Sequence, residues 1–183
     1  MAPPPRTSDL VVERIASEAL PPAIRREIVD LCSEAYEETF DQYLEDVGPG
    51  VHLFGRVEGA LAAHLMWVPR LLEVGSRLGL RTAYVEAVAT RPAFQRRGLA
   101  STLLRRFPTE VADFDLAALC PSDAAFYQRL GWQLWRGPLF IRTPSGPQST
   151  PEEQVMILPL PKTPLHLPLD APLSAEWRKG ELW

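Results

Sequence analysis

The stretch that decides the fold reads Tyr84-Val85-Glu86-Ala87-Val88-Ala89-Thr90-Arg91-Pro92-Ala93-Phe94-Gln95-Arg96-Arg97-Gly98-Leu99-Ala100-Ser101-Thr102-Leu103-Leu104. Residues 83–89 are mostly apolar and alternate as a strand does, but Val85 and Val88 fall out of strict step, which predicts a β-bulge. Pro92 ends the strand. Residues 95–100 open a helix with one apolar face, formed by Leu99, Leu103, Leu104 and Phe107. The pattern therefore predicts a strand, a short basic loop and a helix.

The basic loop has the chemistry of a phosphate site. The first turn of a helix presents unpaired N–H groups and a positive partial charge, which favour a bound anion. Gly98 and Ala100 leave room for close approach to the backbone, and Arg96 and Arg97 add permanent charge. An ordinary turn with two solvated arginines is the alternative. The loop has no lysine of the P-loop type, which argues against a nucleoside triphosphatase.

Composition limits the class of protein. The chain has 183 residues, 46% hydrophobic and 23% charged, as expected of one globular domain over residues 1–183. We expect a flexible proline-rich tail over residues 1–8 and a proline-rich C-terminal segment, 137–183, that contributes to the substrate site. The net charge of −4 argues against a nucleic-acid binder. Two cysteines, no apolar run of membrane-spanning length and no metal-ligand spacing favour a cytoplasmic protein that needs no metal and contacts no membrane.

Periodicity predicts the remaining elements. Helices are expected at 23–36, 39–46, from Gly98 to a stop at Pro108, and at 124–130, where Ser122 caps the start and Gly131 closes the end. Strands are expected at 10–14, 51–57, 60–68, 83–89, 114–119, 132–136 and 155–158, with a hairpin turn at Glu58-Gly59. The proline-rich last quarter is expected to be extended segments and loops.

Gln95-x-x-Gly98-x-Ala100 after an apolar strand resembles the acetyl-CoA signature of the GCN5-related N-acetyltransferases, the GNAT family. The order of elements is similar too. The resemblance implies an α/β (α+β) GNAT fold, with a central mixed, mostly antiparallel sheet flanked by helices and strands that splay at the acetyl-CoA site. It implies that the backbone of Ala87, Val88 and Ala89 pairs with the pantetheine arm. It also implies that a second group cradles the phosphates: Gln95, Arg96, Arg97, Gly98, Leu99, Ala100 and Ser101.

Several further motifs are similar to those of the aminoglycoside 2'-N-acetyltransferases. The ending Glu176-Trp177-Arg178-Lys179-Gly180-Glu181-Leu182-Trp183 resembles their Asp-Trp-Arg-x-Gly-x-x-Trp. Gly137-Pro138, Thr143-Pro144-Ser145-Gly146-Pro147 and Thr150-Pro151-Glu152-Glu153 resemble their Gly-Pro, Pro-Thr-Gly-Pro and Thr-Pro-acid segments. The resemblance implies transfer of acetyl from acetyl-CoA to a 2'-amine by direct attack, with antibiotic resistance as the consequence.

A polycationic substrate requires carboxylates, because each bound ammonium loses water and needs an acceptor. The candidates are Asp41, Glu86, Glu153 and the terminal carboxylate of Trp183. Glu86 stands out, since an acid inside an apolar strand is either paired or functional. The resemblance implies that Glu86 is the base, acting through water. It also implies that Tyr127, which precedes Gly131-Trp132, protonates the leaving thiolate.

The chain departs from that subfamily in two places. Ala87 stands where the resembling enzymes have glycine, and their spaced early acids become a looser set here: Glu37, Glu38, Asp41, Glu45 and Asp46. Kasugamycin, a less cationic aminoglycoside, is therefore an open alternative substrate. Other open readings are acetylation of another small amine or a peptide N-terminus, and a non-catalytic acyl-CoA-binding regulatory domain. A homodimer is also left open.

His64 and Cys120 each allow both a structural and a chemical interpretation. His64 lies in a strand pattern and is expected to be a satisfied core residue and not a catalyst. Cys120 ends a strand near the cofactor region, where a covalent acyl-cysteine is conceivable. We expect it to be a small buried residue instead.

Overall fold

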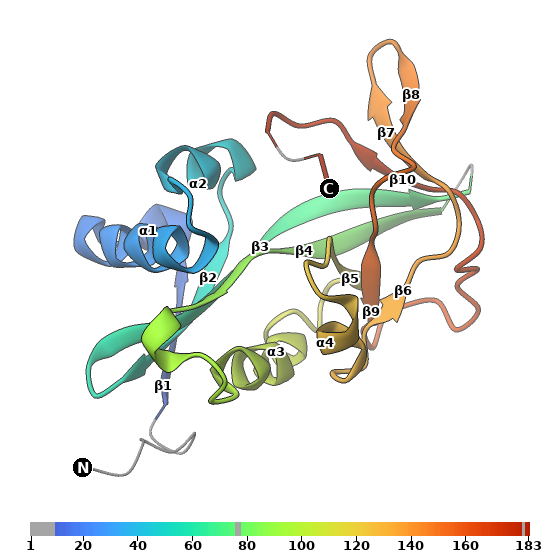
Figure 1. Ribbon diagram of the computed structural model, residues 1–183. Coiled ribbons are helices and arrows are strands. Elements are labelled where there is room, and N and C mark those ends of the chain that lie inside the picture. Colours follow the sequence, from blue (N-terminus) through green and yellow to red (C-terminus); the bar gives the residue numbers. More distant parts are fainter. Residues whose placement is uncertain (1–9, 76–77, 181) are drawn as a thin grey trace. The chain divides into compact units, whose positions relative to one another are not determined.

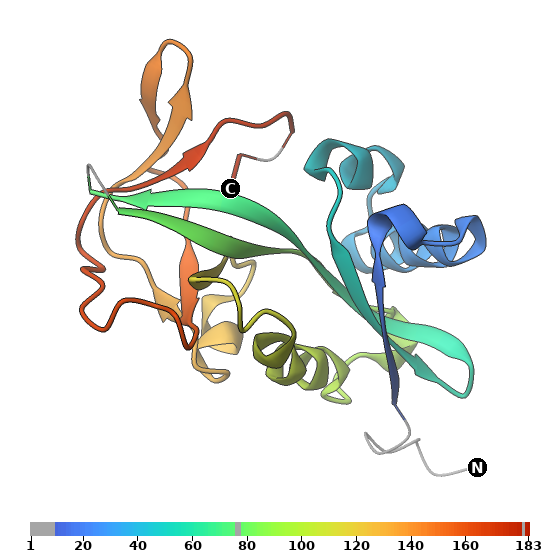
Figure 2. The ribbon, with the colours of Figure 1, turned by 180° about the vertical axis from the view of Figure 1, so that it is seen from behind.

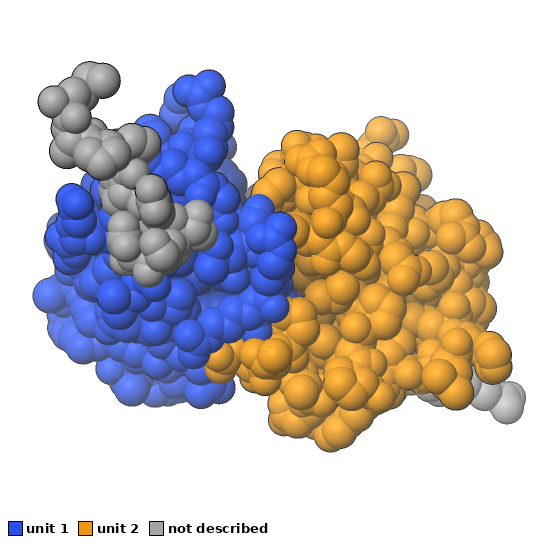
Figure 3. All heavy atoms as spheres, turned by 90° about the horizontal axis from the view of Figure 1, so that it is seen from below, with its two compact units in different colours: residues 1–68, 85–107 blue, residues 69–84, 108–183 orange. Residues whose placement is uncertain are grey.

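The computed structural model describes residues 10–75, 78–180 and 182–183, so the tail expected over residues 1–8 lies outside the described residues (Figure 1). The chain divides into two compact units, residues 1–68 with 85–107 and residues 69–84 with 108–183 (Figure 3). A single domain over residues 1–183 stays a prediction. Within the described ranges, no helix has the length and apolar character needed to cross a membrane.

The described part of the chain contains one mixed sheet of ten strands. Its strands are β1 Val11–Ala16, β2 Val51–Val57, β3 Ala60–Val74, β4 Leu78–Thr90, β5 Leu116–Leu119, β6 Gln133–Leu134, β7 Leu139–Thr143, β8 Gly146–Ser149, β9 Met156–Pro159 and β10 Leu173–Glu176. The helices are α1 Pro22–Tyr36, α2 Asp41–Val47, α3 Leu99–Glu110 and α4 Ala124–Gln128, with 3-10 turns η2 Ser17–Ala19 and η3 Pro92–Phe94. The β4–β5 and β7–β10 pairs are parallel, and the other pairs described below are antiparallel.

Unit 1 is built on the meander β1–β2–β3. Its hairpin turns at Glu58 and Gly59, both with positive φ (51° and 83°), which confirms the predicted turn. Helix α1 packs on one face of the meander, where Cys32 lies against the ring of His64. Helix α3 packs on the other face, where Phe107 makes an edge contact with Trp67, whose side chain points opposite to that of His64. Figures 1 and 2 show α1 and α3 on opposite sides of β3.

Two helix termini differ from the sequence-based expectation. The predicted apolar face of α3 is confirmed, since Leu99, Leu103, Leu104 and Phe107 are at most 3% exposed. The predicted stop at Pro108 is wrong, because α3 continues to Glu110. Burial of Phe107 on one side of Pro108 and Val111 on the other offsets the missing N–H of the proline. The predicted cap of α4 is also wrong: the Oδ1 atom of Asp123, not Ser122, accepts from the N–H of Phe126 at 3.2 Å.

Unit 2 contains the strand order β6–β9–β5–β4–β3–β10–β7–β8. Strands β7, β8 and β10 occupy the proline-rich region where the sequence predicts extended segments and loops without locating individual strands. Strand β10 pairs with β3 antiparallel through Leu173↔Val74, and with β7 parallel through Leu173↔Leu139. These strands are four or five residues long and lie between prolines and glycines, so their own periodicity is weak. Strand β10 is held by β3, β7 by β10 and β8 by β7, and these pairings between distant segments are invisible in the local sequence.

Candidate active site

Strand β4 departs from regular strand geometry at Ala87, within the stretch where the sequence predicts a bulge; the bulge itself stays a prediction. Ala87 has φ +50°, the left-handed region in which glycine is favoured. Its carbonyl oxygen lies 2.9 Å from Nδ1 of His64, and the carbonyl oxygen of Val88 accepts from the hydroxyl of Tyr36 at 2.9 Å. Two successive carbonyls thus accept from side chains of unit 1. The positive φ also gives a physical reason for the glycine that the resembling enzymes have at this position.

The basic loop between β4 and α3 folds into a backbone turn suited to an anion. Arg96 and Gly98 both have positive φ, 59° and 76°, and α3 begins at Leu99. The first intrahelical bond runs from the N–H of Thr102 to the carbonyl of Gly98 at 3.0 Å. The N–H groups that precede Thr102 have no intrahelical acceptor, because they belong to the first turn. A Cβ built on Gly98 would meet no atom within 4 Å, so the space beside Gly98 is open.

Side chains order the loop from within. The Nε2 atom of Gln95 donates to the carbonyl of Thr90 at 3.2 Å, and the guanidinium of Arg97 lies 5.2 Å from the ring centre of Phe94. The remaining predicted phosphate residues, Ala100 and Ser101, occupy the first turn of α3. Unit 1 therefore brings together every residue that the sequence assigns to acetyl-CoA.

Glu86 is buried in β4, with 6% of its surface exposed. Its Oε2 atom accepts from the hydroxyl of Tyr43 at 2.7 Å. Tyr43, Phe40 and Tyr36 form a row of rings, with centroid distances of 4.4 Å and 5.0 Å. Helices α1 and α2 therefore supply the hydroxyl groups that contact Glu86 and Val88. The sequence alone does not single out either tyrosine; their aromatic character around Phe40 is the only local signal, and it does not point to Glu86.

Tyr127 lies in α4 of unit 2 and is 6% exposed. Burial raises the pKa of the Tyr127 hydroxyl to about 12, and the charges of Asp123 and Cys120 act in the same direction. The phenol is therefore protonated at neutral pH and has a proton to donate. The expectation of a buried Cys120 is wrong: this cysteine is exposed, because it follows the last residue of β5. Its Sγ atom lies 3.7 Å from Oε2 of Glu153, a poor setting for a nucleophilic thiolate.

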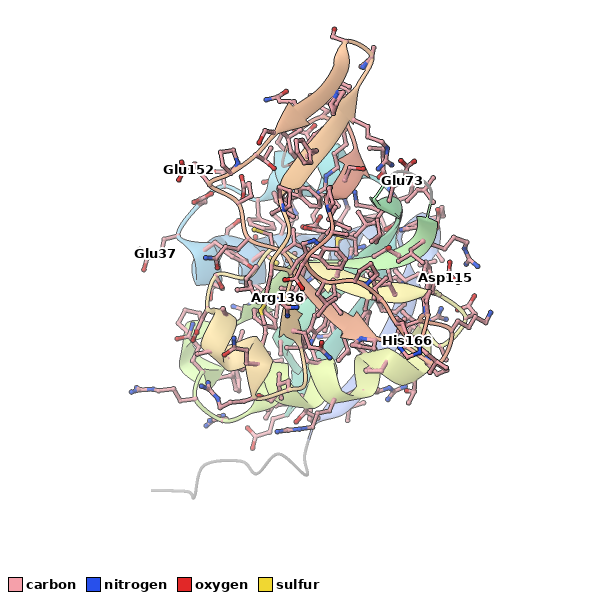
Figure 4. All side chains as sticks on the ribbon, turned by 90° about the vertical axis from the view of Figure 1, so that its right-hand side faces the viewer. Glu37, Glu73, Asp115, Arg136, Glu152 and His166 are labelled. Carbon is pink, nitrogen blue, oxygen red and sulfur yellow. The ribbon has the colours of Figure 1, made fainter. Side chains whose placement is uncertain are left out.

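A cavity of about 740 Å³ in unit 2 is lined by one of the predicted substrate residues, Glu153, and by Thr150, which contacts a second, Trp183. Thr150 lines the cavity and accepts from Nε1 of Trp183 at 2.8 Å, and Trp183 is itself 4% exposed. Glu153 lines it together with Glu152, which projects outward after β8 in Figure 4. Arg136 also lines it, but its charge is matched by two bonds of 2.7 Å to the carboxylate of Asp170.

The residues before Trp183 are fixed by Arg70, which is 4% exposed in β3. Its guanidinium donates to the carbonyls of Leu182 and Glu176, both at 2.8 Å, and lies 4.9 Å from the ring centre of Tyr84. This role of Arg70 is not evident from the sequence. An arginine inside an otherwise apolar strand was the available signal.

The early acids are at the surface of unit 1. Glu37 ends α1 and projects outward (Figure 4), Glu45 pairs with Arg25 at 3.5 Å, and Asp46 accepts from Gln42 at 2.9 Å. Asp41 lines a hollow of about 190 Å³ that also contains Arg25 and Arg26. Two neighbouring cations disfavour an ammonium ligand, so this setting favours an ordinary surface carboxylate at Asp41.

Two further findings concern the candidate groups. His64 is fully buried and hydrogen-bonded, which confirms the expectation of a satisfied core residue. In the described ranges, no group of three or more His, Cys, Asp and Glu side chains has an arrangement that could hold a metal ion.

Comparison with known proteins identifies the protein family to which the chain belongs. A family model described as an acetyltransferase (GNAT) domain matches residues 24–135. An aminoglycoside 2'-N-acetyltransferase of Mycolicibacterium fortuitum is 36% identical over 157 residues, which cover 82% of this chain and 80% of the relative. These matches define the protein as an acetyltransferase. The chain belongs to the GNAT family, and the predicted acetyl-CoA-dependent N-acetyltransferase is thereby confirmed.

Solved structures show the same fold. The GNAT family N-acetyltransferase YhbS of Escherichia coli, in complex with CoA, has a TM-score of 0.61 at 15% identity and covers 97% of this chain and 93% of its own. A GNAT family acetyltransferase of Brucella melitensis, in complex with acetyl-CoA, has a TM-score of 0.53 at 16% identity and covers 68% and 82%. The chain spans about a third of the length of several other structural neighbours, which match it at 33% of their own chains. The predicted GNAT fold is confirmed.

Proposed function

We propose that this protein is an aminoglycoside 2'-N-acetyltransferase that transfers acetyl from acetyl-CoA by direct attack of the amine. The observation that carries the proposal is the cavity in unit 2, where Glu152 and Glu153 lie on the segment that also holds Trp183 through Thr150. Two of the segments that resemble the aminoglycoside enzymes, Gly137-Pro138 and residues 150–153, therefore line one cavity, and Trp183 of a third contacts Thr150 at its wall. The 36% identical relative from M. fortuitum supports the same substrate class.

Acetyl-CoA fits the bulged strand and the loop of unit 1. We propose that the backbone of Ala87, Val88 and Ala89 binds the pantetheine arm and that residues 95–101 bind the pyrophosphate. The open space before Gly98 and the first-turn amides of α3 support this placement. Acetyl-CoA supplies a thioester carbonyl for the amine to attack. The chain supplies the groups that bind, orient and move protons.

We propose that Glu86 is the general base and Tyr127 the general acid. Nearby carboxylates stabilise the charged form of a bound amine, so the ammonium group must lose a proton before its nitrogen can attack the thioester. Glu86 is suited to accept it through water, because its buried carboxylate is oriented by the hydroxyl of Tyr43. Tyr127 is suited to donate to the sulfur of the leaving group, because its raised pKa keeps the proton on the phenol. The exposed Cys120 has no place in this scheme.

The acids of the cavity test the substrate class. Glu153→Gln should raise the KM for the aminoglycoside roughly three- to tenfold, the range for an exposed charge-assisted contact, and leave the KM for acetyl-CoA unchanged. Glu18→Gln, an exposed acid in η2 of unit 1, is the matched control and should change neither. If Glu153→Gln leaves aminoglycoside kinetics unchanged, the cavity is not the substrate site.

The choice among substrates is open to the same assay. Kasugamycin carries less positive charge, so its KM should respond less to Glu153→Gln than that of a more cationic aminoglycoside. Another small amine or a peptide N-terminus remains the competing substrate class. Resistance, a cytoplasmic location and a homodimer are proposals to be tested by growth on aminoglycosides, by fractionation and by light scattering, respectively.

A further inference from the structure

A row of hydrogen bonds runs through the interior of unit 1 and ends on the bulge of β4. The N–H of Gly50 donates to Oγ of Ser17 at 3.0 Å, and Oγ of Ser17 lies 3.1 Å from Nε2 of His52. Nδ1 of His52 lies 2.9 Å from Nε2 of His64, and Nδ1 of His64 lies 2.9 Å from the carbonyl oxygen of Ala87. His64 is fully buried and His52 is 3% exposed.

The donor and acceptor of every hydrogen bond in the row follow from the last acceptor, the carbonyl oxygen of Ala87. A carbonyl oxygen only accepts, so Nδ1 of His64 carries the hydrogen and Nε2 of that neutral ring accepts. Nδ1 of His52 must therefore donate, and its Nε2 accepts from the hydroxyl of Ser17. The Ser17 oxygen accepts in turn from Gly50. Both tautomers are thus fixed, and each ring nitrogen has a partner.

The surroundings keep both rings neutral. Burial lowers the pKa of His64 to about 3, aided by His52, and lowers the pKa of His52 to about 4, aided by the charge of Arg25. Around His52, Arg25 from α1 and Glu45 from α2 line the same cavity. Cys32 from α1 is the titratable group beside His64, with its Sγ atom 3.8 Å from Nδ1. The donor to Ala87 is therefore present throughout the neutral pH range.

The row of hydrogen bonds ends on the peptide group between Ala87 and Val88, and it holds the orientation of that group. An alanine at positive φ is unfavourable by itself, so its conformation depends on contacts in the folded chain. The C=O of Ala87 and the N–H of Val88 belong to one trans peptide and point in opposite directions. Holding the carbonyl toward His64 therefore aims the Val88 N–H to the other side of β4.

We propose that His64 and His52 are positioning residues for acetyl-CoA: their hydrogen-bonded row fixes the Ala87–Val88 peptide in the orientation that receives the cofactor arm. The proposal rests on the proposed binding of that arm by Ala87, Val88 and Ala89. A packing role alone would predict a loss of stability from any change at His64. A positioning role predicts that only loss of the donor to Ala87 weakens acetyl-CoA binding.

Two amide substitutions at His64 separate these roles. The side-chain NH2 of asparagine occupies the position of Nδ1, and the side-chain carbonyl oxygen of glutamine reaches the position of Nε2, where it accepts from His52. His64→Asn keeps a donor to Ala87, and His64→Gln keeps a partner for His52 but removes that donor. Cys32→Ala is the matched control, since it loosens packing against the same ring and leaves the row intact.

The readout is the Kd for acetyl-CoA by calorimetry, together with the two KM values and the melting temperature. We expect His64→Gln to weaken acetyl-CoA binding about tenfold, within the range for loss of a buried hydrogen bond, and to leave the amine KM unchanged. His64→Asn should stay within about twofold of wild type, as should Cys32→Ala. If His64→Gln binds as tightly as His64→Asn, or if Cys32→Ala weakens binding equally, the proposal is overturned.

A failure of the proposed function would give a different experimental result from a failure of the positioning role of His64 and His52. Direct binding of acetyl-CoA needs no aminoglycoside, so a wrong substrate class leaves this experiment intact. A wrong cofactor site would appear as unchanged acetyl-CoA affinity after substitution at Gly98. If His64→Gln does not fold, two variants of His52 replace it. His52→Asn keeps the donor to His64 and should bind acetyl-CoA as wild type does. His52→Leu removes that donor and should weaken acetyl-CoA binding. Equal affinity in that pair also overturns the proposal.

Discussion

The hydroxyl of Tyr43 lies 2.7 Å from Oε2 of Glu86, so helix α2 holds the one buried carboxylate of β4 in the described chain. A hydrogen bond to a carboxylate is charge-assisted and stronger than a neutral one. The sequence offered two readings of Glu86, paired or functional, and the geometry is compatible with both at once.

The role of Glu86 as a base predicts a large kinetic effect. Glu86→Gln should lower kcat/KM for the amine by about two to four powers of ten, the usual range for general acid–base catalysis, and remove the acidic limb of its pH profile. Tyr43→Phe should lower it by much less, because the carboxylate remains. Measuring kcat/KM against pH for the three proteins distinguishes these effects. An acidic limb that persists in Glu86→Gln would assign the base to another group.

The role of Tyr127 as an acid predicts a change in kcat. Tyr127→Phe should lower kcat by at least about two powers of ten and leave the Kd for acetyl-CoA near its wild-type value. Its raised pKa of about 12 means that the phenol stays protonated across the physiological pH range. Tyr84→Phe, which removes another buried hydroxyl of unit 2, is the control and should keep kcat. Wild-type turnover by Tyr127→Phe, with chemistry shown to be rate-limiting, would leave Tyr127 with packing alone.

The phosphate loop predicts a position-specific loss of binding. Gly98→Val should nearly abolish acetyl-CoA binding, because a side chain at φ +76° would enter the open space beside Gly98. Gly59→Val in the β2–β3 turn is a matched control, with φ +83° and the same open surroundings. Both variants should lose similar stability in urea. Arg97→Ala should weaken binding only several-fold, since the backbone carries most of the contact. Equal acetyl-CoA affinity in the two glycine variants would remove the loop from the site.

The buried histidines predict how stability depends on pH. The folded-state pKa values of about 4 for His52 and about 3 for His64 lie below the ordinary value of 6.5, so below pH 6.5 the unfolded chain binds more protons. Their contribution to the free energy of unfolding is complete above pH 6.5. It is lost as the pH falls toward 4 and 3, by up to about 1.4 kcal/mol per pH unit for each ring.

Urea titrations between pH 4.5 and 7.5 test this dependence. His52→Asn should flatten the slope, because one of the two titrating rings is gone. His166→Asn changes an exposed histidine and should leave the slope as in wild type. Parallel slopes for wild type and His52→Asn would show that His52 is not held neutral by the fold.

Much of the fold could be predicted because it depends on long periodic segments. The helical spacing of α1 and α3 and the Glu58-Gly59 turn are local signals, and each appears where expected. The features that the sequence does not predict occur where a distant partner decides. Strand β10 exists because Leu173 pairs with Val74 of β3, and α3 passes Pro108 because Phe107 and Val111 are buried.

The residues of the candidate site also fall into a group that the sequence reveals and a group that only the fold reveals. Glu86, Tyr127 and the loop around Gly98 belong to contiguous motifs that a single sequence exposes. Tyr43, His52 and Arg70 act on residues far away in the chain, with contacts to Glu86, His64 and Leu182. No spacing rule links those pairs, so only the folded chain reveals them.

The most direct measurement of the central claim is thiol release from acetyl-CoA with two matched aminoglycosides. One carries a 2'-amine, and its counterpart carries a 2'-hydroxyl and the same other amines. We predict thiol release with the first only, and NMR of its product should place the acetyl group on the 2'-nitrogen. Equal thiol release with both compounds, or release with neither but with another amine, would contradict the proposed activity.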